Sequence, residues 1–494
     1  MNVTVIGTGY VGAVTGACLG FLGHRVTCVD VDETRIAKLR QGKSPIYEPG
    51  LEELIEMARS RGTISFDTDV AVAVRGSDVI FIAVGTPSLP SGETNLAYLE
   101  SAARSIGAAM EPGRFYVVVN KSTVPVGCGN LVEALVRDGA IEARPDSQID
   151  FAVASNPEFL REGSAIHDSL YPGRIVLGSP SGRAIVNLKT LYKPLTEQRF
   201  DAPVFAPRPA GMGEVPIVST SLASAEMIKY SANAFLALKI GFANEMANIC
   251  ERVGADVVEV MSGIGLDSRI GSGFLNAGIG WGGSCFGKDV SSLLHTAAEY
   301  GYEARILAAS LAVNKLQRSV VIQKLQEKLY ILKGRTIALL GLAFKPDTDD
   351  LRDAPAIQIA ERLLRMGARV RVFDPIAMDA CRAQHPNLQL CYCDDALSAA
   401  TGADAVVLVT EWPEFAALDL EEIAARMNRR VLIDGRNLFS AERAMEAGFE
   451  YAGVGRPSRQ ARPDLAGSLA EPGVTVRVAV ASAAESRAAV NAGR

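Results

Sequence analysis

A single cysteine, Cys285, stands between a glycine pair and a Lys-Asp pair in the stretch GGSCFGKD, residues 282–289. A free thiol has a pKa of about 8.5, so only about a few per cent of it is thiolate at neutral pH. A nearby cation lowers the pKa of a thiol, and Lys288 is close in sequence. Because the flanking glycines let a substrate approach closely, we expect Cys285 to be a nucleophile activated by Lys288.

The other cysteines have a plainer interpretation. A buried structural thiol is the commonest fate of a cytosolic cysteine, and we expect it for Cys18, Cys28, Cys128 and Cys250. Cys391 and Cys393 have no second pair or histidine cluster near them, so we expect no zinc site and no other metal. The eight cysteines are scattered through a long chain, which indicates reduced thiols and not a disulfide framework.

A second chemical signal lies at the N-terminus, in VTVIGTGYVG. Gly7 permits a tight turn, Gly9 lets a pyrophosphate approach the backbone, and Gly12 allows close helix packing. The start of the following helix offers N–H groups to phosphates. Asp30 ends the second apolar run and would accept hydrogen bonds from a ribose, which favours NAD over NADP, although Arg35 could accommodate a 2′-phosphate.

A thiol beside bound NAD has a specific use. It adds to an aldehyde as a thiohemiacetal, and hydride loss then leaves a thioester that water releases as a carboxylic acid. The pairing of Cys285 with a dinucleotide site therefore predicts oxidation to the acid level. Two alternatives remain open at this point: a one-step NAD dehydrogenase, yielding one NADH per substrate, and a non-enzymatic NAD-binding protein in which Cys285 is structural.

The elements that must position these residues follow an alternating pattern. In the N-terminal third, apolar runs between helical patterns predict buried parallel strands at 3–7, 25–30, 78–87, 115–125 and 150–158. Residues 222–253 lack strong breakers except Gly241 and predict one long helix, and a second helical region extends to about residue 328. The strand pattern then returns at 336–344, 369–375 and 404–413.

The predicted fold is α/β, with two Rossmann-like doubly wound domains joined by a long central helix. The expected divisions are an NAD-binding domain at 1–205, a helical connector with the cysteine loop at 206–325, a second Rossmann-like domain at 326–455 and a disordered tail at 456–494. The returning pattern lacks the glycine fingerprint, so a second nucleotide would bind there in a different manner.

The composition indicates which classes of binding partner to expect. The net charge is -6, with 50 basic and 56 acidic residues, which gives no electrostatic reason to expect nucleic acid or an anionic membrane. No apolar run approaches the roughly 20 residues of a membrane span, and the first strand leaves no room for a signal peptide. We therefore expect a cytoplasmic protein with a small-molecule substrate.

From residue 1 to about 455 the chain resembles the UDP-glucose/GDP-mannose dehydrogenase family. The motifs are GTGYVG, VGTP, KSTVPVG, SNPEFLREG, KYSANAFLALKIGFANE, FLNAGIGWGGSCFGKD and GLAFKPDTDDLRDAPA. The resemblance implies a four-electron oxidation of a sugar C6 alcohol with two NAD, and a homodimer formed through the long helix. It implies UDP-glucose as substrate and UDP-glucuronate as product, a branch that Phe286 favours; GDP-mannose and a UDP-N-acetylhexosamine remain alternatives.

The resemblance also implies roles for particular residues. Cys285 is the nucleophile, Lys229 and Asn233 hold the reacting oxygen, and Asp289 takes part in proton transfer. Glu158 activates the hydrolytic water and Thr123 orients it, although Glu158 and Glu162 could instead be a helix-capping pair. The implied cofactor residues are Gly7, Gly9, Tyr10, Val11, Gly12, Asp30, Arg35, Thr86, Thr123, Glu162, Lys288 and Arg352.

The implied substrate residues combine the catalytic loop with a sugar-nucleotide loop. They are Glu158, Phe159, Leu160, Lys229, Asn233, Arg269, Phe274, Leu275, Asn276, Ala277, Gly278, Gly282, Lys345 and Arg436. Among them, Arg269 is implied to reach the neighbouring subunit's site. Two positions depart from the family pattern: Gly287 stands where proline is common, and Trp281 where tyrosine is usual. We expect Gly287 to loosen the backbone beside the nucleophile.

Overall fold

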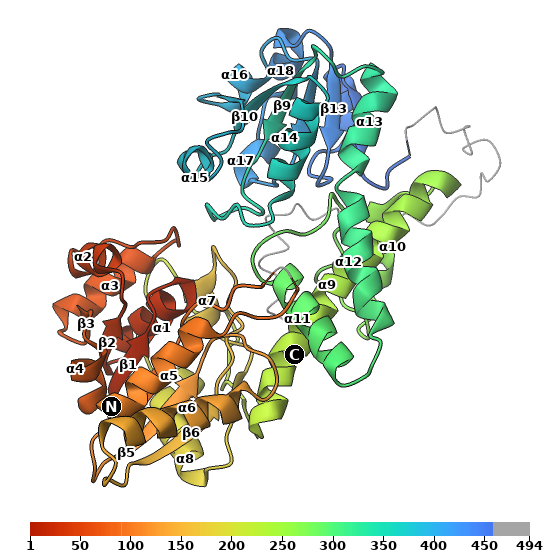
Figure 1. Cartoon of the computed structure of the whole chain (residues 1–494). Helices are drawn as coiled ribbons and strands as arrows, with labels where there is room; N and C mark the ends of the chain where they lie inside the picture. The colour runs from red at the N-terminus through yellow and green to blue at the C-terminus, as the bar shows by residue number, and fades with distance from the viewer. Residues whose placement is uncertain (90, 458–494) are drawn as a thin grey trace.

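The computed structural model describes residues 1–89 and 91–457 (Figure 1). In this part of the chain two parallel-sheet α/β units are joined by a long helix, as predicted. The expectation of a disordered tail falls, from residue 458 on, outside the described residues. Among the described helices, none combines the length and apolar character needed to cross a membrane.

The first sheet has the strand order β3-β2-β1-β4-β5-β6-β7-β8. Its strands are β1 (Asn2–Ile6), β2 (Arg25–Val29), β3 (Ile64–Asp67), β4 (Val79–Ile82), β5 (Phe115–Asn120), β6 (Asp150–Ser155), β7 (Ile175–Gly178) and β8 (Ile217–Thr220). All pairs are parallel except β6 with β7. The order reverses between β1 and β4, so the carboxyl ends of these two strands frame the crevice where such sheets bind ligands.

Helices cover both faces of this sheet. They are α1 (Tyr10–Phe21), α2 (Glu33–Arg40), α3 (Leu51–Ser60), α4 (Val70–Arg75), α5 (Ala97–Ala109), α6 (Cys128–Ala143), α7 (Ala165–Leu170) and α8 (Gly182–Thr196). The two faces are separate apolar cores: α1 and α3 pack on one, α5 and α6 on the other. Cys18, Cys28 and Cys128 are buried here, and Cys250 is buried farther along the chain, as expected.

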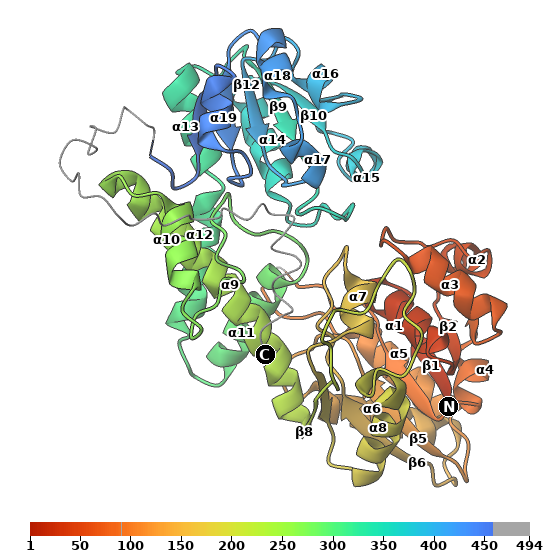
Figure 2. The same cartoon turned by 180° about the vertical axis from the view of Figure 1, so that it is seen from behind.

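The central helix α9 (Leu222–Val253) has the bounds that the sequence predicted. The Ser221 side chain caps its start by accepting the Ser224 N–H, and Gly254 ends it with φ 78°. The helices that follow are α10 (Val257–Gly265), α11 (Phe286–Glu299), α12 (Arg305–Gln317) and α13 (Val320–Leu329). Both views show α9 running from β8 beside the first sheet to α10 near the second, with α11 and α12 alongside (Figures 1 and 2).

The second sheet is parallel throughout, in the order β11-β10-β9-β12-β13-β14. Its strands are β9 (Thr336–Leu340), β10 (Arg369–Phe373), β11 (Leu390–Tyr392), β12 (Ala405–Leu408), β13 (Val431–Asp434) and β14 (Glu450–Gly453). Its helices are α14 (Pro355–Arg365), α15 (Met378–Gln384), α16 (Ala396–Ala400), α17 (Pro413–Ala416), α18 (Leu420–Arg426) and α19 (Ala441–Glu446). The sequence reading missed the short strands β3, β7, β8, β11, β13 and β14.

Two expected boundaries do not follow the sheets. β8 pairs with β7 in the first sheet although it lies beyond residue 205. Helix α13 packs against β13 and α14 although it begins before residue 326. Because backbone pairing and apolar packing define a folding unit, we propose limits of 1–220, 221–319 and 320–455.

Candidate active site

The cysteine loop ends at the start of a helix. Cys285 is the N-cap residue of α11, and its Sγ lies 3.6 Å from the Ser284 hydroxyl oxygen. Asp289 follows in the first turn of α11 and is 1% exposed. The helix start therefore places the thiol at an accessible edge and the carboxylate behind it.

Five buried or half-buried side chains from α9, α11 and the segment after β6 meet behind the thiol. The Lys229 Nζ is 2.9 Å from the Glu158 Oε1. The Asn233 Nδ2 donates to the Asp289 Oδ2 at 2.6 Å, and the Lys288 Nζ donates to the Asp289 Oδ1 at 2.7 Å. Lys229 and Asn233 lie one helical turn apart, which places both on the same face of α9. The structure thus links the residues that the sequence grouped.

Glu158 is held in place by its own segment. Its Oε2 accepts the Leu160 N–H at 2.8 Å, and the residue is 7% exposed. Helix α7 begins only at Ala165, so the alternative that Glu158 and Glu162 cap a helix is wrong. The Lys229 Nζ lies 5.4 Å from the centre of the Phe159 ring, so the aromatic side chain also borders the buried ion pair.

The charges around the thiol differ from the expectation. The pKa of Cys285 is raised, first by desolvation and then by the Glu158 charge, and Lys229 is the cation that opposes this. Lys288 instead pairs with Asp289. Although Cys285 has accessible surface, the surrounding protein atoms desolvate its thiolate. The structure therefore favours Lys229 over Lys288 as the cation beside the thiol, because the Lys288 ammonium group pairs with Asp289.

Lys229 keeps its proton despite burial. Desolvation lowers its pKa, but the negative charges of Glu158, Cys285 and Asp289 outweigh that effect and raise the pKa overall. The ammonium form therefore persists well above neutral pH. A buried permanent cation beside a reactive sulfur can stabilise negative charge on a substrate oxygen.

The glycine fingerprint forms an open cradle at the start of α1. Gly7 has φ 95°, and a side chain at Gly12 would collide with the Gly7 carbonyl oxygen. Nothing lies within 4 Å of a Cβ built on Gly9, the N-cap residue, which leaves room for a ligand. The Asp30 Oδ2 accepts the Thr8 N–H at 2.7 Å, and Arg35 lies 3.8 Å from the same oxygen.

Other predicted cofactor residues line the neighbouring loops. The Thr86 Oγ1 donates to the Thr123 carbonyl oxygen at 2.9 Å, which joins the segments after β4 and β5. The Tyr10 hydroxyl bonds to Glu48 and accepts the Gly163 N–H. Val11 is partly buried in the core beneath. The fit of this cradle to a dinucleotide therefore depends on Gly9, Asp30 and the free first turn of α1.

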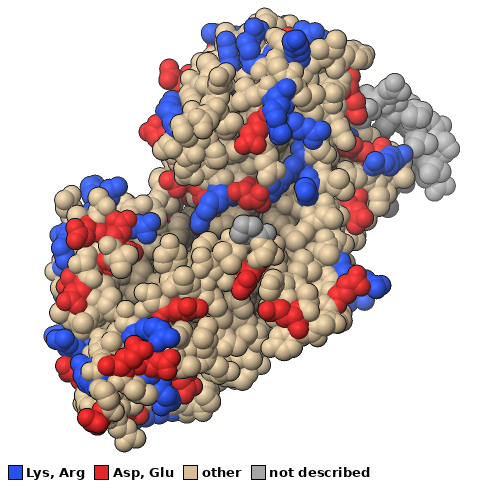
Figure 3. Space-filling view, in the orientation of Figure 1, with Lys and Arg blue, Asp and Glu red and all other residues tan. Residues whose placement is uncertain are grey.

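The second α/β unit reaches into the first at Glu162. The Arg352 Nη2 is 3.1 Å from the Glu162 Oε1, and the Lys345 ammonium donates to the Glu162 carbonyl. Burial raises the pKa of Glu162 to about 8, with a further rise from the Asp350 charge. Figure 3 shows Lys and Arg side chains together with Asp and Glu along the hollow between the two lobes.

The predicted sugar-nucleotide loop lies between α10 and the second sheet. Arg436 donates to the Gly280 carbonyl at 2.9 Å, and the Gly278 N–H donates to Asn244 at 2.8 Å. Phe274 has φ 63°, and Gly282 packs so closely on the Asp353 carbonyl that no side chain would fit. Leu275, Asn276, Ala277 and Arg436 border a hollow of about 270 Å³.

Arg269 is the predicted residue that the single chain does not bring to the others. Its side chain is 87% exposed and pairs only with Asp267 in the described residues, at 2.6 Å. The sequence did not indicate several residues that lie beside the predicted site residues in the fold. They are Thr8, Glu48, Lys121, Asn156 and Asp350. Lys121 was visible in the motif KSTVPVG, but only the fold shows it to be inside the molecule.

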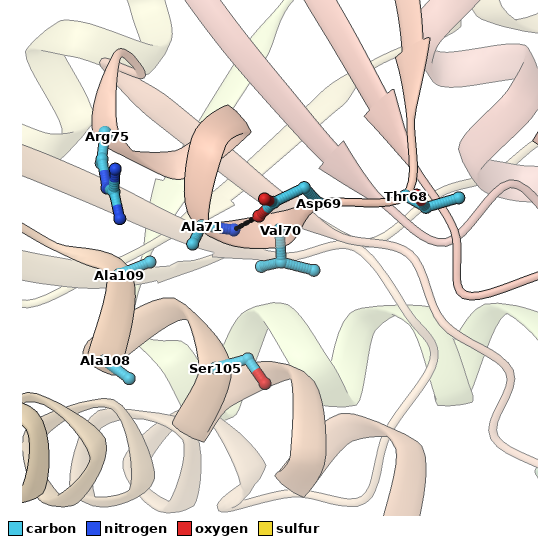
Figure 4. Close-up of a pocket in the computed structure, with 8 residues that line it drawn as sticks. All are labelled: Thr68, Asp69, Val70, Ala71, Arg75, Ser105, Ala108 and Ala109. Atoms are coloured by element: carbon cyan, nitrogen blue, oxygen red, sulfur yellow. Dashed lines mark hydrogen bonds between the residues drawn. The ribbon is translucent and has the colours of Figure 1, made fainter.

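A larger hollow, of about 560 Å³, lies elsewhere, between α4 and α5 (Figure 4). Its one carboxylate, Asp69, is occupied in capping α4, accepting the Ala71 N–H at 2.8 Å. It contains none of the residues described above. In the described chain no cluster of three or more His, Cys, Asp or Glu side chains could hold a metal ion.

Three family models cover most of the chain. Residues 1–196 match the NAD binding domain of the UDP-glucose/GDP-mannose dehydrogenase family, 223–316 match its central domain, and 338–441 match its UDP binding domain. The match to the NAD binding domain agrees with the open cradle at Gly9.

Relatives match over nearly the whole length. The chain is 45% identical over 457 residues to UDP-glucose 6-dehydrogenase TuaD of Bacillus subtilis (strain 168), covering 92% of this chain and 94% of the relative. It is 44% identical to UDP-glucose 6-dehydrogenase of Rhizobium meliloti (strain 1021), covering 92% and 100%. A UDP-glucose dehydrogenase structure from Pyrobaculum islandicum is 40% identical with a TM-score of 0.81, covering 92% and 97%. The chain belongs to the UDP-glucose/GDP-mannose dehydrogenase family of NAD-binding oxidoreductases.

Proposed function

We propose that this protein oxidises UDP-glucose at C6 to UDP-glucuronate in two NAD-dependent steps, as a cytoplasmic homodimer. The observation that carries the proposal is the cluster of Cys285, Lys229, Asn233, Asp289 and Glu158 at the junction of the two α/β units. A simple alcohol dehydrogenase has no use for the thiol. The relatives that match over the full length are UDP-glucose 6-dehydrogenases, which supports UDP-glucose as the substrate.

Lys229 and Asn233 hold the C6 oxygen of the sugar in this mechanism. The buried ammonium group of Lys229 stabilises the negative charge that develops when the hydroxyl proton leaves. Asp289 orients the Asn233 amide through their 2.6 Å hydrogen bond and passes the proton on with Lys229, through water. Because both α9 residues are fixed by ion pairs or hydrogen bonds, they need little rearrangement in the transition state.

Cys285 then retains the carbon at the aldehyde level. Its sulfur bonds to the C6 carbon as a thiohemiacetal and carries the same carbon as a thioester after the second oxidation. Glu158 takes a proton from water, the water oxygen bonds to C6, and the sulfur leaves with a proton. Thr123, which follows β5 nearby, helps to orient that water.

The residues of the first unit fit NAD. Gly9 leaves room for the pyrophosphate, the first turn of α1 supplies N–H groups, and Asp30 offers a carboxylate to the ribose. When bound, NAD supplies a hydride acceptor for each oxidation. Thr86, Glu162, Lys288 and Arg352 are proposed as further NAD contacts, and Arg35 lies beside Asp30.

The second unit supplies the positive charge for the UDP diphosphate. Lys345 and Arg436 are the proposed phosphate contacts, because both carry positive charge near the proposed site. Arg436 donates to the Gly280 carbonyl beside the sugar-nucleotide loop, and Lys345 donates to the Glu162 carbonyl where the two units meet. The backbone of residues 274–278 and Gly282 wraps the sugar. Phe159 and Leu160 contribute from the first unit.

Helix α9 supports the dimer. Phe235, Phe242 and Ile249 recur at seven-residue intervals and are 61%, 45% and 47% exposed. A row of large apolar side chains along one face of a helix is typical of helix–helix association. Arg269 does not contact the proposed site of its own chain, and in the dimer it would reach the site of the partner.

The test is the number of NADH formed per limiting UDP-glucose with excess NAD, for the wild type and for Cys285→Ser. Two NADH per sugar, with the variant stalled before acid release, would support the proposal. One NADH per sugar would reduce the protein to a one-step dehydrogenase. No NADH from UDP-glucose but two from GDP-mannose or a UDP-N-acetylhexosamine would keep the mechanism and change the substrate.

A further inference from the structure

Lys121 is a lysine inside the first unit that the mechanism above does not use. It directly follows β5, and its Nζ donates to the Asn156 Oδ1 at 3.1 Å. Asn156 is itself fixed: it donates to the Val176 carbonyl and accepts from the Tyr192 hydroxyl at 2.6 Å. Since Asn156 and Glu158 share the segment after β6, the ammonium group is anchored beside the proposed general base.

Lys121 and Glu158 line the same internal hollow, of about 80 Å³. The other charged residues there are already occupied. Asp168 pairs with Arg161 at 2.7 Å, and the Arg174 guanidinium lies 3.9 Å from the centre of the Phe159 ring. The hollow has room for water to bridge polar groups. Glu158 is the carboxylate of the lining whose charge acts on Lys121, although it also pairs with Lys229.

The two groups influence each other electrostatically. Burial lowers the pKa of Lys121 to about 8, Glu158 and Cys18 raise it against that effect, and Lys229 lowers it. Lys121 is only partly buried, because part of its side chain lines the hollow. The Glu158 carboxylate therefore helps to keep Lys121 charged at neutral pH.

Lys229 cannot remain the ion-pair partner of Glu158 throughout the proposed reaction. Its ammonium group pairs with Glu158 at 2.9 Å, yet the proposed mechanism gives it the substrate oxygen. A buried carboxylate that loses its partner is costly in the ionised form and tends to take up a proton. A protonated Glu158 could not accept a proton from water.

We propose that Lys121 is a positioning residue for Glu158, whose ammonium group keeps that carboxylate ionised and oriented while Lys229 holds the substrate oxygen. The inference rests on the proposed function. It predicts that Lys121 matters for release of the acid from Cys285 and matters little for the first oxidation.

The experiment compares Lys121→Met with Lys324→Met, using UDP-glucose and NAD. Lys324 is also a buried lysine paired with a carboxylate, Glu251 at 2.7 Å, but it lies on α13. Rapid-mixing measurements follow the first NADH, and intact-protein mass follows the adduct on Cys285. Lys121→Met should leave the first oxidation within about twofold and slow hydrolysis about tenfold or more, so that the adduct accumulates. The control should show neither effect.

A pH profile separates positioning from mere structural support. The acid limb of the hydrolysis rate should move to higher pH in Lys121→Met and return in Lys121→Arg, which restores the charge. Should Lys121→Met fail to fold, Lys121→Gln, which retains a donor for Asn156, carries the same test. An unchanged profile, or equal slowing of both steps, would overturn the inference. Failure of the proposed function is distinguishable, because the wild type itself would then form no adduct.

Discussion

The two parallel sheets begin with the same backbone plan. Gly7 follows β1 with φ 95°, and its N–H donates to the Val29 carbonyl at the end of β2. Gly341 follows β9 with φ 99°, and its N–H donates to the Phe373 carbonyl at the end of β10. Both hydrogen bonds are 2.8 Å long. The difference between the units therefore arises after this shared turn.

The aspartates that end the second strands show one difference. Asp30 and Asp374 both accept backbone N–H groups of the glycine turn. Asp374 also accepts the Trp412 indole N–H at 3.1 Å and is 1% exposed, whereas the Asp30 side chain is 10% exposed and borders the cradle. The corresponding carboxylate is thus partly accessible in the first unit and enclosed in the core of the second.

The segment after the glycine shows the second difference. In the first unit α1 starts at Tyr10, so its N-terminus faces the cradle. In the second unit α14 starts only at Pro355, and the intervening loop carries Lys345 and Arg352 across to Glu162. One fold plan therefore yields an open cradle at the start of α1 in the first unit and, in the second, a loop that contacts the first unit at Glu162.

The largest expected effect lies at the junction of the units. Cys285→Ala should reduce NADH formation from UDP-glucose by about 10³-fold or more, because the nucleophile is lost. Both ligands should still bind, as calorimetry can check, since each half of the site is intact. Cys391→Ala, at an exposed thiol on β11, is the matched control. Retention of more than a tenth of the activity would show that the thiol is structural.

Asp374→Ala tests the claim that the second aspartate is structural. Removal of a buried carboxylate that accepts several N–H donors should lower the free energy of unfolding by about 3 kcal/mol or more. The KM for NAD should stay within about twofold. Denaturant unfolding measures the free energy of unfolding, and initial rates measure the KM for NAD. A raised KM for NAD would contradict the claim that Asp374 has only a structural role.

Asp30→Ala is the counterpart in the first unit. It should raise the KM for NAD about tenfold or more, since hydrogen bonds to a charged acceptor contribute about 1.5–3 kcal/mol each. It should also improve the use of NADP relative to NAD, because a carboxylate repels the 2′-phosphate. An unchanged KM would mean that the open cradle is not the NAD site.

The contact between the units should depend on pH. The pKa of Glu162 is raised from 4.5 to about 8, first by burial. Between pH 4.5 and about pH 8, Glu162 is therefore protonated in the folded chain and ionised in the unfolded chain. Stability without ligands should therefore fall as pH rises through about 5 to 8 and be unaffected by this group below that window. Unfolding midpoints measured from about pH 5 to 8 should change less with pH in Glu162→Gln than in the wild type. Glu421→Gln, at an exposed residue of α18, should leave the pH dependence unchanged.

The smallest effect is expected at Gly287. The structure places it in the first turn of α11, and a Cβ there would lie 3.5 Å from the Trp281 ring, an ordinary contact. Gly287→Ala should stabilise the protein by about 0.4–1 kcal/mol and leave turnover within about twofold. A large loss of activity would instead support the expectation that this glycine loosens the nucleophile loop.

Much of the architecture could be predicted because its signals are local. The bounds of α9 follow from a long run between Ser221 and Gly254 in which Gly241 is the one strong breaker. The first strands of each sheet are long apolar runs. The short strands β8 and β13 escaped prediction because four residues carry too little periodicity to distinguish a strand from a loop.

The site was predictable as a set of residues but not as an arrangement. Local motifs named Cys285, Lys229 and Glu158 as candidates, and the fold brings them together. Lys288 is close to the thiol in sequence, whereas in the fold its partner is Asp289. Lys121 was quoted within a motif and received no role, since a lysine is exposed by default.

The sequence by itself determined which chemistry was available: a dinucleotide turn, an isolated thiol and the long helix between two repeated patterns. Only the tertiary structure decided which charges meet. Lys229 pairs with Glu158, 71 positions away in the sequence, and Arg352 reaches Glu162 from the other unit. Electrostatic effects depend on distance and burial, and both are set by packing between elements that no local pattern encodes.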